Sequence, residues 1–367
     1  MIFNLEKLQM KRVLIDLERL RYPNTGLANV FTNIAKGIEN QNFDISVSYF
    51  GPRKELLKIV PSAQIIPYRK WHKYKENFSQ QFDLIHLSNQ GTPYFRKKYK
   101  KAIKILTIHD LNFLHEPLSL RKKTKINRRI NKTLENVNYL VCISEFVRQD
   151  VLKHQNILNL NHLKDIFVVH NGIELPQNRS YSLGKYEFLK DKKYLLNIGV
   201  LFAKKNQKTL IEMLPYLSED LVLVASSSKK EYENDVKNSI QRLGLQDRVH
   251  ILSNISQEEK YAIIQHCQAM CHPSLAEGFG IPPIEAMAFG KPVFLSKNTS
   301  LPEIGGEIAF YFENFDPKTM ANTLQKGFKI YYENIDEFLL KTKKWVAQFD
   351  YQVMASNYLE IYKKILG

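Results

Sequence analysis

The stretch PSLAEGFGIPPIEAMAFGKP, residues 273–292, carries the clearest structural signal in the chain. Two carboxylates, Glu277 and Glu285, stand eight residues apart across a glycine-rich turn, and two prolines follow that turn. Proline suits the first turn of a helix, where its missing N–H group needs no partner. We therefore expect a helix over 282–289 whose positive end directs the backbone N–H groups of 278–281 at an anion or a hydroxyl.

Isolated glutamates in such a stretch have a plain structural explanation. Glu277 would cap the helix, and Glu285 would lie on a helix face that is exposed to solvent. The glycines that flank them favour a ligand site instead. Glu277 would then lie on the loop before the helix, with Glu285 in the first turns on the same side of the site.

Both halves of the chain alternate between short strands and helices, a pattern typical of parallel sheets. The second half predicts strands at 194–199, 221–225, 249–252, 269–272 and 292–295, with helices at 208–214, 231–243 and 258–266. The first half predicts strands at 11–16, 45–50, 84–87, 103–108, 139–143 and 166–169, with a helix at 146–154. The first strand leads through a loop with Gly26 into an apolar helix, as in nucleotide-binding βαβ units. The polar segment 176–190 loses the periodicity, so we place a linker there.

The composition restricts the classes of protein that need to be considered. With 367 residues, 44% of them hydrophobic, the chain is long enough for two domains with a sizeable core. No run of about 18 apolar residues argues for a membrane span, and residues 1–10 do not resemble a secretory signal. Three cysteines are too few for a disulfide framework, and Cys267 and Cys271 lack further ligands for zinc. We expect buried thiols in a reducing cytoplasm.

Positive charge is concentrated in the first half of the chain. Residues 1–180 hold 30 Lys and Arg against 15 Asp and Glu, whereas residues 181–367 hold 23 against 22. Such asymmetry predicts an anionic partner for the first half. Basic clusters lie at 68–75, 96–101 and 121–132. No nucleic-acid-binding module surrounds them, so we expect no nucleic acid; an anionic membrane surface and a solvated lysine-rich face remain.

Residues 277–293 match, almost residue for residue, the E-x7-E signature of the retaining family 4 glycosyltransferases of the GT-B fold. The chain resembles this family over almost its whole length. Further segments that are similar to family motifs are TIHDL at 107–111, VCISEF at 141–146, VHNG at 169–172, NIGVLFAKKN at 197–206 and SLPEIG at 300–305.

The resemblance implies an α/β protein with two Rossmann-like domains that face each other across a cleft. We expect an acceptor-side domain at 1–180 and a nucleotide-sugar-binding domain at 190–345. A C-terminal helix at 346–367 is expected to cross back to the first domain. The apolar stripe along 351–366 agrees with such a helix.

The resemblance also implies roles for the charged residues. Glu277 would hold the transferred sugar and support its oxocarbenium-like transition state. Lys205, with Lys204 beside it, would hold the donor diphosphate, and Glu285 would bind the ribose hydroxyls. Preorganised cations stabilise the departing diphosphate without a metal, so we expect no metal and no cofactor. Lysine at 204, where the family usually has arginine, keeps the charge and loses bidentate phosphate recognition.

The remaining contacts implied by the resemblance come from backbone and from the first domain. Backbone N–H groups at the glycine-rich turn would contact the donor, namely those of Gly278, Phe279, Gly280 and Ile281. His109 would approach the sugar as the third catalytic residue, although a histidine at a strand end is also an ordinary core residue. Gly26 would let its loop come close to the phosphates, with Thr25 where many relatives have a second glycine.

We expect a hexosyltransferase that moves a mannose- or glucose-type hexose from a nucleotide diphosphate sugar to a glycan or lipid-linked saccharide acceptor. Such transfer would serve bacterial surface polysaccharide or lipopolysaccharide biosynthesis, in the cytoplasm or peripherally on the inner face of the cytoplasmic membrane. Retention is implied by the resemblance, not by carboxylate spacing. Two alternatives stay open: a GT-B nucleotide-sugar epimerase, which needs no acceptor, and a non-catalytic donor-binding homologue. Intact Glu277, Glu285 and Lys205 argue against the second.

Overall fold

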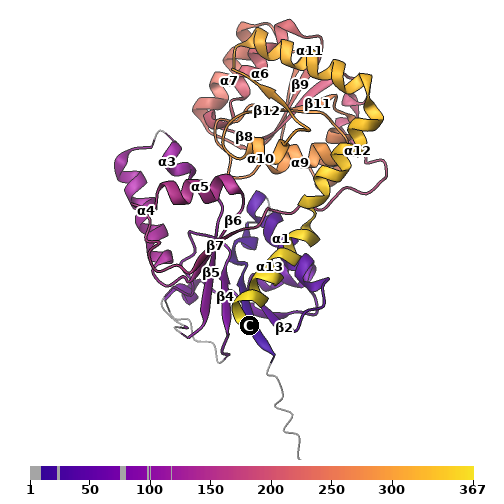
Figure 1. The fold of residues 1–367 in the computed structure, drawn as a ribbon. Helices are drawn as coiled ribbons and strands as arrows, with labels where there is room; N and C mark the ends of the chain where they lie inside the picture. Colours follow the sequence, from indigo (N-terminus) through magenta and orange to yellow (C-terminus); the bar gives the residue numbers. More distant parts are fainter. Residues whose placement is uncertain (1–9, 23–24, 75–79, 97–98, 100, 117) are drawn as a thin grey trace, which may run out of the picture. The chain divides into compact units, whose positions relative to one another are not determined.

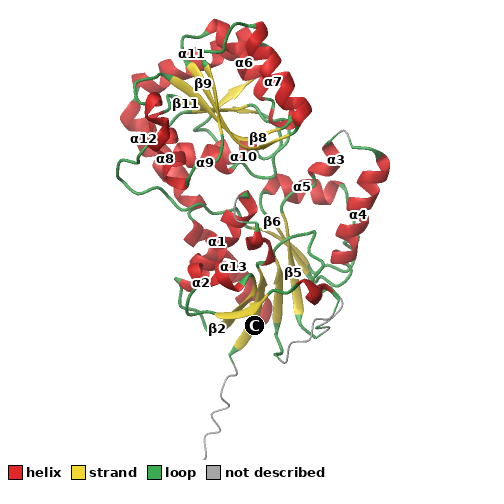
Figure 2. Cartoon of the chain, turned by 180° about the vertical axis from the view of Figure 1, so that it is seen from behind, coloured by secondary structure: helices red, strands yellow, loops and turns green. Residues whose placement is uncertain are grey.

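The computed structural model describes residues 10–22, 25–74, 80–96, 99, 101–116 and 118–367. The chain divides into two compact units. We call Met1–Gly172 together with Tyr351–Gly367 the first unit, and Ile173–Asp350 the second unit. Each contains a parallel sheet with helices packed around it (Figures 1 and 2), and each is described by itself.

The first unit is built on a seven-stranded sheet with the order β3-β2-β1-β4-β5-β6-β7. Every strand pair in it is parallel. Because the strands are parallel, the loops that follow their carboxyl ends all leave from one edge of the sheet. The strands are β1 Lys11–Asp16, β2 Ile45–Gly51, β3 Gln64–Pro67, β4 Leu84–Leu87, β5 Ile103–Ile108, β6 Tyr139–Cys142 and β7 Asp165–Val168.

Helices connect these strands, and their first residues carry ordinary capping signals. Thr25 caps α1 by accepting a hydrogen bond from the Ala28 backbone N–H at 3.3 Å, and Ser144 caps α5 through Val147 at 3.1 Å. The helices are α1 Gly26–Glu39, α2 Arg53–Ile59, α3 Asn112–His115, α4 Leu120–Leu134, α5 Glu145–Lys153 and α13 Tyr351–Leu366, with the 3₁₀ helices η1 Glu18–Arg21 and η2 Lys70–Lys73.

The C-terminal helix α13 belongs to the first unit and packs along α1 (Figures 1 and 2). A Cβ atom at Gly37 of α1 would lie 2.6 Å from the Ala355 Cβ, so the close approach requires glycine there. Two tyrosines of α13 reach the sheet: the hydroxyl of Tyr362 lies 2.6 Å from the His86 Nδ1, and that of Tyr358 lies 3.2 Å from the Thr107 Oγ1. Helix α13 therefore contributes to the first unit's core although it follows the second unit in sequence.

The second unit has a six-stranded parallel sheet with the order β10-β9-β8-β11-β12-β13. Its strands are β8 Tyr194–Leu201, β9 Asp220–Ser228, β10 Val249–Leu252, β11 Ala269–His272, β12 Val293–Ser296 and β13 Phe310–Phe312. Its α-helices are α6 Gln207–Met213, α7 Lys230–Arg242, α8 Gln257–His266, α9 Ile281–Ala288, α10 Leu301–Gly305, α11 Pro317–Glu333 and α12 Ile335–Val346. The 3₁₀ helices are η3 Gly184–Leu189, η4 Ala203–Lys205, η5 Leu214–Tyr216 and η6 Ala347–Phe349.

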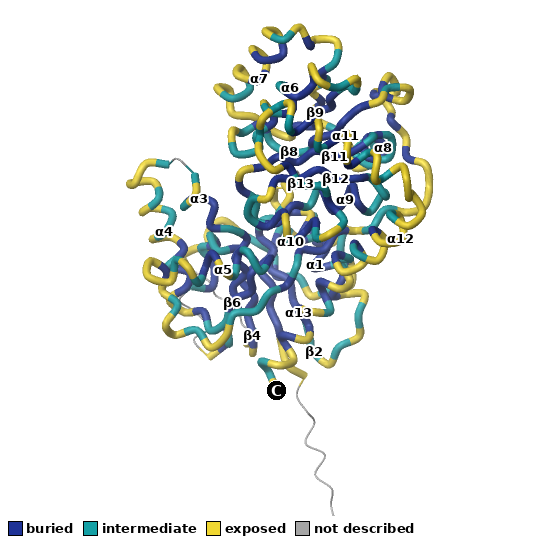
Figure 3. Tube along the Cα trace, turned by 45° about the horizontal axis from the view of Figure 1, so that its top comes forward, coloured by how far each residue is buried: buried dark blue, intermediate teal, exposed yellow. Residues whose placement is uncertain are grey.

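The cores lie where the strands meet the helices. Strands such as β4, β11 and β12 are buried along their whole length, whereas the outer faces of α4, α7 and α12 are exposed (Figure 3). Strands that are covered on both faces are near-continuous runs of apolar residues, as the sequences of these strands are. The predicted α/β class with two Rossmann-like sheets is confirmed.

Three expectations about the chain's organisation need correction. The short strands β3 and β13 were not expected, because four and three residues are too few to show a period. The expected linker at 176–190 packs within the second unit, where Tyr181 and Leu189 are buried. These apolar residues anchor the segment although their spacing follows no helical or strand period. The chain passes from the first unit to the second between Gly172 and Ile173 and returns between Asp350 and Tyr351. The sequence predicts these boundaries near 180–190 and 345. The functions assigned to the two domains remain predictions.

Candidate active site

The glycine-rich turn and helix α9 form in the second unit, close to where the sequence indicates. Gly280 is the N-cap of α9 and has φ 118° and ψ 53°, a left-handed conformation that favours glycine. No side chain caps this helix, so the alternative in which Glu277 is a helix cap is wrong. Phe279 is buried with its ring 6.0 Å from that of Phe349, which leaves only its backbone for a ligand. Ile281 is the first residue of α9.

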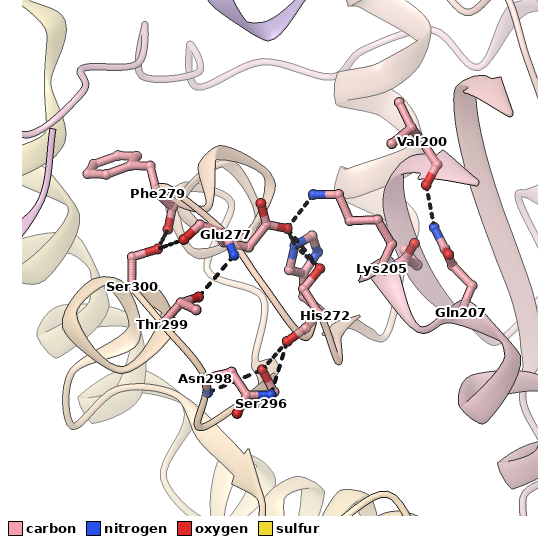
Figure 4. A network of polar contacts seen from close by, with 12 residues as sticks. Val200, Lys205, Gln207, His272, Glu277, Phe279, Ser296, Asn298, Thr299 and Ser300 are labelled. Carbon is pink, nitrogen blue, oxygen red and sulfur yellow. Dashed lines mark hydrogen bonds and ion pairs between the residues drawn. The ribbon is translucent and has the colours of Figure 1, made fainter. Parts of the chain in front are cut away.

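Three donors converge on one carboxylate oxygen of Glu277 (Figure 4). The Lys205 ammonium forms an ion pair with Oε1, the Nε2 of His272 lies 2.7 Å from it, and the Ser274 hydroxyl donates to it at 2.8 Å. None of the described residues donates a hydrogen bond to Oε2. The backbone N–H of Glu277 donates to the Thr299 Oγ1 at 2.9 Å. The carboxylate is thus fixed through one oxygen, and the other remains available to a ligand.

The protonation states around Glu277 follow from these contacts. Burial acts to raise the pKa of Glu277, but the charge of Lys205 and the hydrogen bond from His272 outweigh it, so the pKa lies well below its ordinary value. A carboxylate can only accept, so the Nε2 of His272 carries the proton of that contact. The other ring nitrogen, Nδ1, is buried and has no partner among the described residues.

Lys205 is held in place by the loop that follows β8. The residues 203–205 form η4, and Asn206 closes it in a left-handed conformation with φ 57°. The Leu275 backbone N–H donates to the Lys204 carbonyl at 2.7 Å, which ties this loop to the residues just before Glu277. The Gln207 side chain donates to the Val200 carbonyl at 2.8 Å (Figure 4). Lys205 and Glu277 therefore meet through two loops that are bonded to each other.

Glu285 lies in α9 and is buried, with 6% of its surface exposed. The alternative of a solvated face residue is therefore wrong. Its Oε1 accepts from the Lys260 ammonium of α8 at 2.5 Å, and both side chains are largely shielded from solvent. Each glutamate of the E-x7-E pattern thus has its own lysine, Lys205 for Glu277 and Lys260 for Glu285.

Sequence reasoning missed three of these partners, His272, Ser274 and Lys260. His272 was expected as the last residue of a strand, and the carboxyl ends of parallel strands are where ligand-binding side chains gather. That signal could have identified His272. Lys260 lies 25 residues before Glu285, and no local pattern connects the two.

His109 and Gly26 lie in the first unit. His109 follows β5 and is 6% exposed; its Nε2 lies 2.7 Å from the Ser88 carbonyl, and its Nδ1 is buried without a hydrogen-bond partner among the described residues. Burial lowers the pKa of His109. At Gly26, the first residue of α1, a Cβ would meet nothing within 4 Å. Packing within the described residues therefore gives no reason for a glycine at 26.

Two general features of the described part of the chain bear on the site. No cluster of three or more His, Cys, Asp or Glu side chains there has an arrangement suited to a metal ion. None of the helices there has the length and apolar character needed to cross a membrane. The absence of a metal requirement remains a prediction.

Curated proteins similar to this chain include two bacterial mannosyltransferases. The chain is 24% identical over 249 residues to the O-antigen chain mannosyltransferase RfbU of Salmonella typhimurium, which covers 68% of the chain and 66% of that protein. It is 24% identical over 225 residues to O-antigen chain mannosyltransferase B of Escherichia coli, which covers 59% and 58%. The chain thus spans less than two thirds of the length of either relative.

Solved structures share the fold over nearly the whole chain. A HepE protein from Anabaena in complex with UDP and glucose aligns with a TM-score of 0.74 at 16% identity, covering 96% of this chain and 100% of that one. Sucrose-phosphate synthase from Thermosynechococcus elongatus aligns with a TM-score of 0.75 at 17% identity, covering 97% and 99%. At these identities the likeness shows the fold alone.

Two family models match consecutive segments of the chain. The model described as Glycosyltransferase Family 4 matches residues 24–177, and the model described as Glycosyl transferases group 1 matches residues 181–336. The two parallel sheets agree with this assignment. The chain belongs to the GT-B glycosyltransferases of the group 1 and Family 4 type.

Proposed function

We propose that this chain is a retaining hexosyltransferase that moves a mannose- or glucose-type hexose from a nucleotide diphosphate sugar to a glycan or lipid-linked saccharide acceptor. Bacterial surface polysaccharide assembly is the context we propose, because similar proteins are named as O-antigen chain mannosyltransferases. In the reaction, the bond from C1 to the diphosphate oxygen breaks and an acceptor oxygen bonds to C1 on the same face. The acceptor proton leaves with the diphosphate.

The observation that carries this proposal is the Lys205–Glu277 pair. Oε1 of Glu277 is saturated by Lys205, His272 and Ser274, whereas Oε2 has no donor among the described residues. We assign Oε2 to a hydroxyl of the transferred sugar, where its fixed negative charge favours a positively charged transition state. The Lys205 ammonium has three protons and can contact the donor diphosphate while it keeps its pair with Glu277.

Glu285 and Lys260 support a nucleotide site in the same unit. We assign Glu285 to the ribose hydroxyls, which can donate to a carboxylate. Lys260 already neutralises Glu285 in the described structure at 2.5 Å, so the site holds a fixed dipole before any donor arrives. The backbone N–H groups of Gly280 and Ile281 stand at the positive end of α9 and support binding of the donor there.

His109 is the residue of the first unit that we assign to the transferred sugar. Its Nε2 lies 2.7 Å from the Ser88 carbonyl and so carries a proton, which leaves Nδ1 as a bare acceptor in the neutral ring. Because burial lowers the pKa of His109, the ring is neutral at physiological pH. Nδ1 is thus suited to accept a hydrogen bond from a sugar hydroxyl. Gly26 is proposed to let the first loop approach the phosphates.

Helix α4 supports peripheral binding to the anionic inner face of the cytoplasmic membrane. It contains no acidic residue, and Leu120 at its start is 81% exposed. Its basic residues are Arg121, Lys122, Lys123, Lys125, Arg128, Arg129 and Lys132. Each such charge near an anionic surface contributes about 1 kcal/mol.

Replacing Lys122, Lys125 and Arg128 together with glutamate should abolish sedimentation of the protein with phosphatidylglycerol vesicles. Phosphatidylcholine vesicles are the control.

The other basic clusters contribute less to this surface than the sequence suggests. Lys104 is buried, and the Arg96 Nε donates to the Thr92 carbonyl at 2.8 Å. Of the expected clusters, Lys75, Lys97, Lys98 and Lys100 lie outside the described residues, as does Asn24 of the first loop.

A thermal-shift panel of UDP, GDP, UDP-glucose and GDP-mannose tests the function. We expect one diphosphate to stabilise the protein selectively, by about 2.7 kcal/mol at a hundredfold excess over Kd. Without acceptor, the unsubstituted protein should slowly hydrolyse the sugar nucleotide and release that diphosphate. This hydrolysis should disappear in Glu277→Gln. The matched control is Glu313→Gln, an exposed glutamate of the second unit paired with Lys297.

Three outcomes would contradict the proposal. Stabilisation by none of the four compounds would exclude the donor site as assigned. Conversion of the donor to an isomeric sugar nucleotide without acceptor would favour an epimerase. Binding without any release of diphosphate by the unsubstituted protein, even with acceptor glycolipids present, would favour a non-catalytic homologue.

A further inference from the structure

Two loops at the carboxyl edge of the first unit's sheet expose a group of aromatic rings. Tyr22 directly follows η1, and Trp71 lies within η2; their exposed fractions are 44% and 47%. Tyr74, which directly follows η2, is 81% exposed. We call these three residues the aromatic group. Single exposed rings are ordinary; here Arg21 contacts the rings of both Tyr22 and Tyr68, which ties the loop after β1 to the segment after β3 that leads into η2.

The aromatic group stands on a fixed base. Phe50 of β2 is fully buried and contacts the rings of Tyr68 and His72, with centroid distances of 6.2 and 5.6 Å. Trp71 packs edge-on against His72 at 4.2 Å, and the His72 Nδ1 accepts from the Arg69 backbone N–H at 3.2 Å. A surface that is already ordered loses little conformational freedom when it binds a ligand.

Arg21 joins the rings to a positively charged surface. Its guanidinium carbon lies 4.6 Å from the ring centroid of Tyr22 and 5.3 Å from that of Tyr68, and its Nη1 donates to the Tyr68 hydroxyl at 3.0 Å. Its Nε pairs with Glu18 at 2.7 Å, yet 35% of the side chain is exposed. Glu18 is buried, and it is the single acidic residue in segments 17–22 and 68–74. The other cations of these two segments are Arg19, Arg69, Lys70 and Lys73.

A continuous series of contacts connects this surface to His109. The Nε2 of His109 lies 2.7 Å from the Ser88 carbonyl, and the Ser88 hydroxyl donates to the Asp16 carbonyl. The Glu18 backbone N–H donates to the Asp16 side chain at 3.0 Å, and Glu18 pairs with Arg21. Ligands of open α/β sheets bind outside the carboxyl ends of the strands. An extended molecule along this edge could therefore have one end near His109 and the other on the aromatic group.

We propose that the aromatic group and the cations around Arg21 bind an acidic oligosaccharide, the part of the acceptor chain that lies beyond the reacting sugar. This inference rests on the proposed function. A pyranose ring presents a face of C–H groups that packs on tyrosine and tryptophan, and the guanidinium fork matches a carboxylate or a phosphate. Aromatic and arginine side chains are also the ones that carry most binding energy at interfaces.

A single-stranded nucleic acid is the competing ligand for rings interspersed with cations. The saccharide is favoured because the chain belongs to a family of glycosyltransferases. Both are polyanions, so the test must compare them directly.

The first experiment uses tryptophan fluorescence, since the chain has two tryptophans, Trp71 and Trp345. In Trp345→Phe, the remaining signal reports on Trp71 alone. We expect a tetrasaccharide of β-1,4-linked mannuronate to shift and quench this emission, and β-1,4-mannotetraose to bind at least fivefold more weakly. The two sugars differ only in the carboxylate at C6. Equal affinity for both, or no effect of either up to 10 mM, overturns the proposal. Tighter binding of dT12 than of the acidic tetrasaccharide also overturns it.

The second experiment measures the affinity of variants for the mannuronate tetrasaccharide by calorimetry. Trp71→Ala should weaken binding at least tenfold and Tyr22→Ala about fivefold, whereas Trp71→Phe should stay within threefold. Tyr216→Ala is the control, because Tyr216 is 50% exposed in the second unit. Wild-type affinity in Trp71→Ala would refute the assignment.

Failure of this inference can be told apart from failure of the proposed function. Trp71→Ala should keep the nucleotide-induced thermal shift, because the donor residues lie in the second unit. If nucleotides cause no thermal shift in the unsubstituted protein, the donor site is rejected. If Trp71→Ala keeps the nucleotide-induced thermal shift and its saccharide affinity is unchanged, only the saccharide surface is rejected.

Discussion

Each unit holds a carboxylate that is largely shielded from solvent at the carboxyl edge of its parallel sheet, and the two carboxylates differ in what lies beside them. Asp16 ends β1 in the first unit, and its partners are the Thr92 hydroxyl at 2.7 Å and the Glu18 backbone N–H. Glu277 follows β11 in the second unit and has Lys205 and His272 on one oxygen. Burial raises the pKa of Asp16 to about 7, whereas the pKa of Glu277 is lowered.

The difference shows that burial alone does not set the charge of a carboxylate. Burial disfavours the ionised form in both cases, and at Glu277 the charge of Lys205 together with the hydrogen bond from His272 reverses that effect. Glu277 therefore stays negative in a shielded place, as a group that stabilises a cationic transition state must. Asp16 takes up a proton near neutral pH and acts as part of the scaffold under the loop with Arg21.

Removing the cation should have the largest effect. In Lys205→Ala, Glu277 loses its ion pair and the diphosphate loses its nearest cation, so we expect kcat to fall by about 10²–10³. The pKa of Glu277 should rise because its main favourable charge is gone. Single-turnover release of nucleoside diphosphate measures the rate, and a loss smaller than tenfold would remove Lys205 from the catalytic residues.

Replacing Asp16 should change how stability depends on pH. The folded protein holds a proton on Asp16 up to about pH 7, which the unfolded chain releases near the ordinary aspartate value. The stabilisation is therefore complete in acid and is lost as the pH rises toward 7, by about 2–3 kcal/mol between pH 5 and 7. Asp16→Asn should remove this slope.

Urea unfolding of Trp345→Phe, followed by the Trp71 emission, reports on the first unit. An identical slope between pH 5 and 7 with aspartate and with asparagine at 16 would contradict the raised pKa. Glu277 should behave in the opposite sense, since its contribution to stability is lost only as the pH falls below the ordinary glutamate value.

A smaller effect is expected at His272, which positions Glu277. His272→Ala removes a hydrogen bond to a charged group and should lower kcat/KM about tenfold. The acid limb of the pH–rate profile should move to higher pH, because His272 helps to lower the pKa of Glu277. His272→Gln can still donate to the carboxylate and should recover most of the activity. Equal loss in both variants would indicate a purely structural role.

The smallest effect is expected for an exposed ion pair of the same chemistry. Lys297 lies 2.7 Å from Glu313, but both side chains are more than half exposed. Lys297→Ala should change the free energy of unfolding by less than about 1 kcal/mol and leave the transfer rate unchanged. A change as large as that of Lys205→Ala would show that shielding from solvent does not distinguish the two pairs.

Local sequence patterns predicted the elements that depend on neighbouring residues. The helix after the glycine-rich turn, the strands around it and the α13 stripe are of this kind, because prolines, glycines and apolar spacing act within a few residues. The partners of the glutamates are different. Lys260 reaches Glu285 across 25 positions, and Lys205 reaches Glu277 across 72. The family resemblance supplied Lys205, and nothing in the sequence supplied Lys260.

Glycine at 172 has a consequence for how the chain is assembled. A Cβ there would lie 2.4 Å from the Tyr351 Cα, and on the other side of the boundary Ile173 pairs with Asp350. The chain thus leaves the first unit and re-enters it at one point, so the second unit is a continuous insertion with adjacent ends. Such an insertion can be cut out and its host rejoined by a few residues, which makes the two units separable modules for domain exchange between family members.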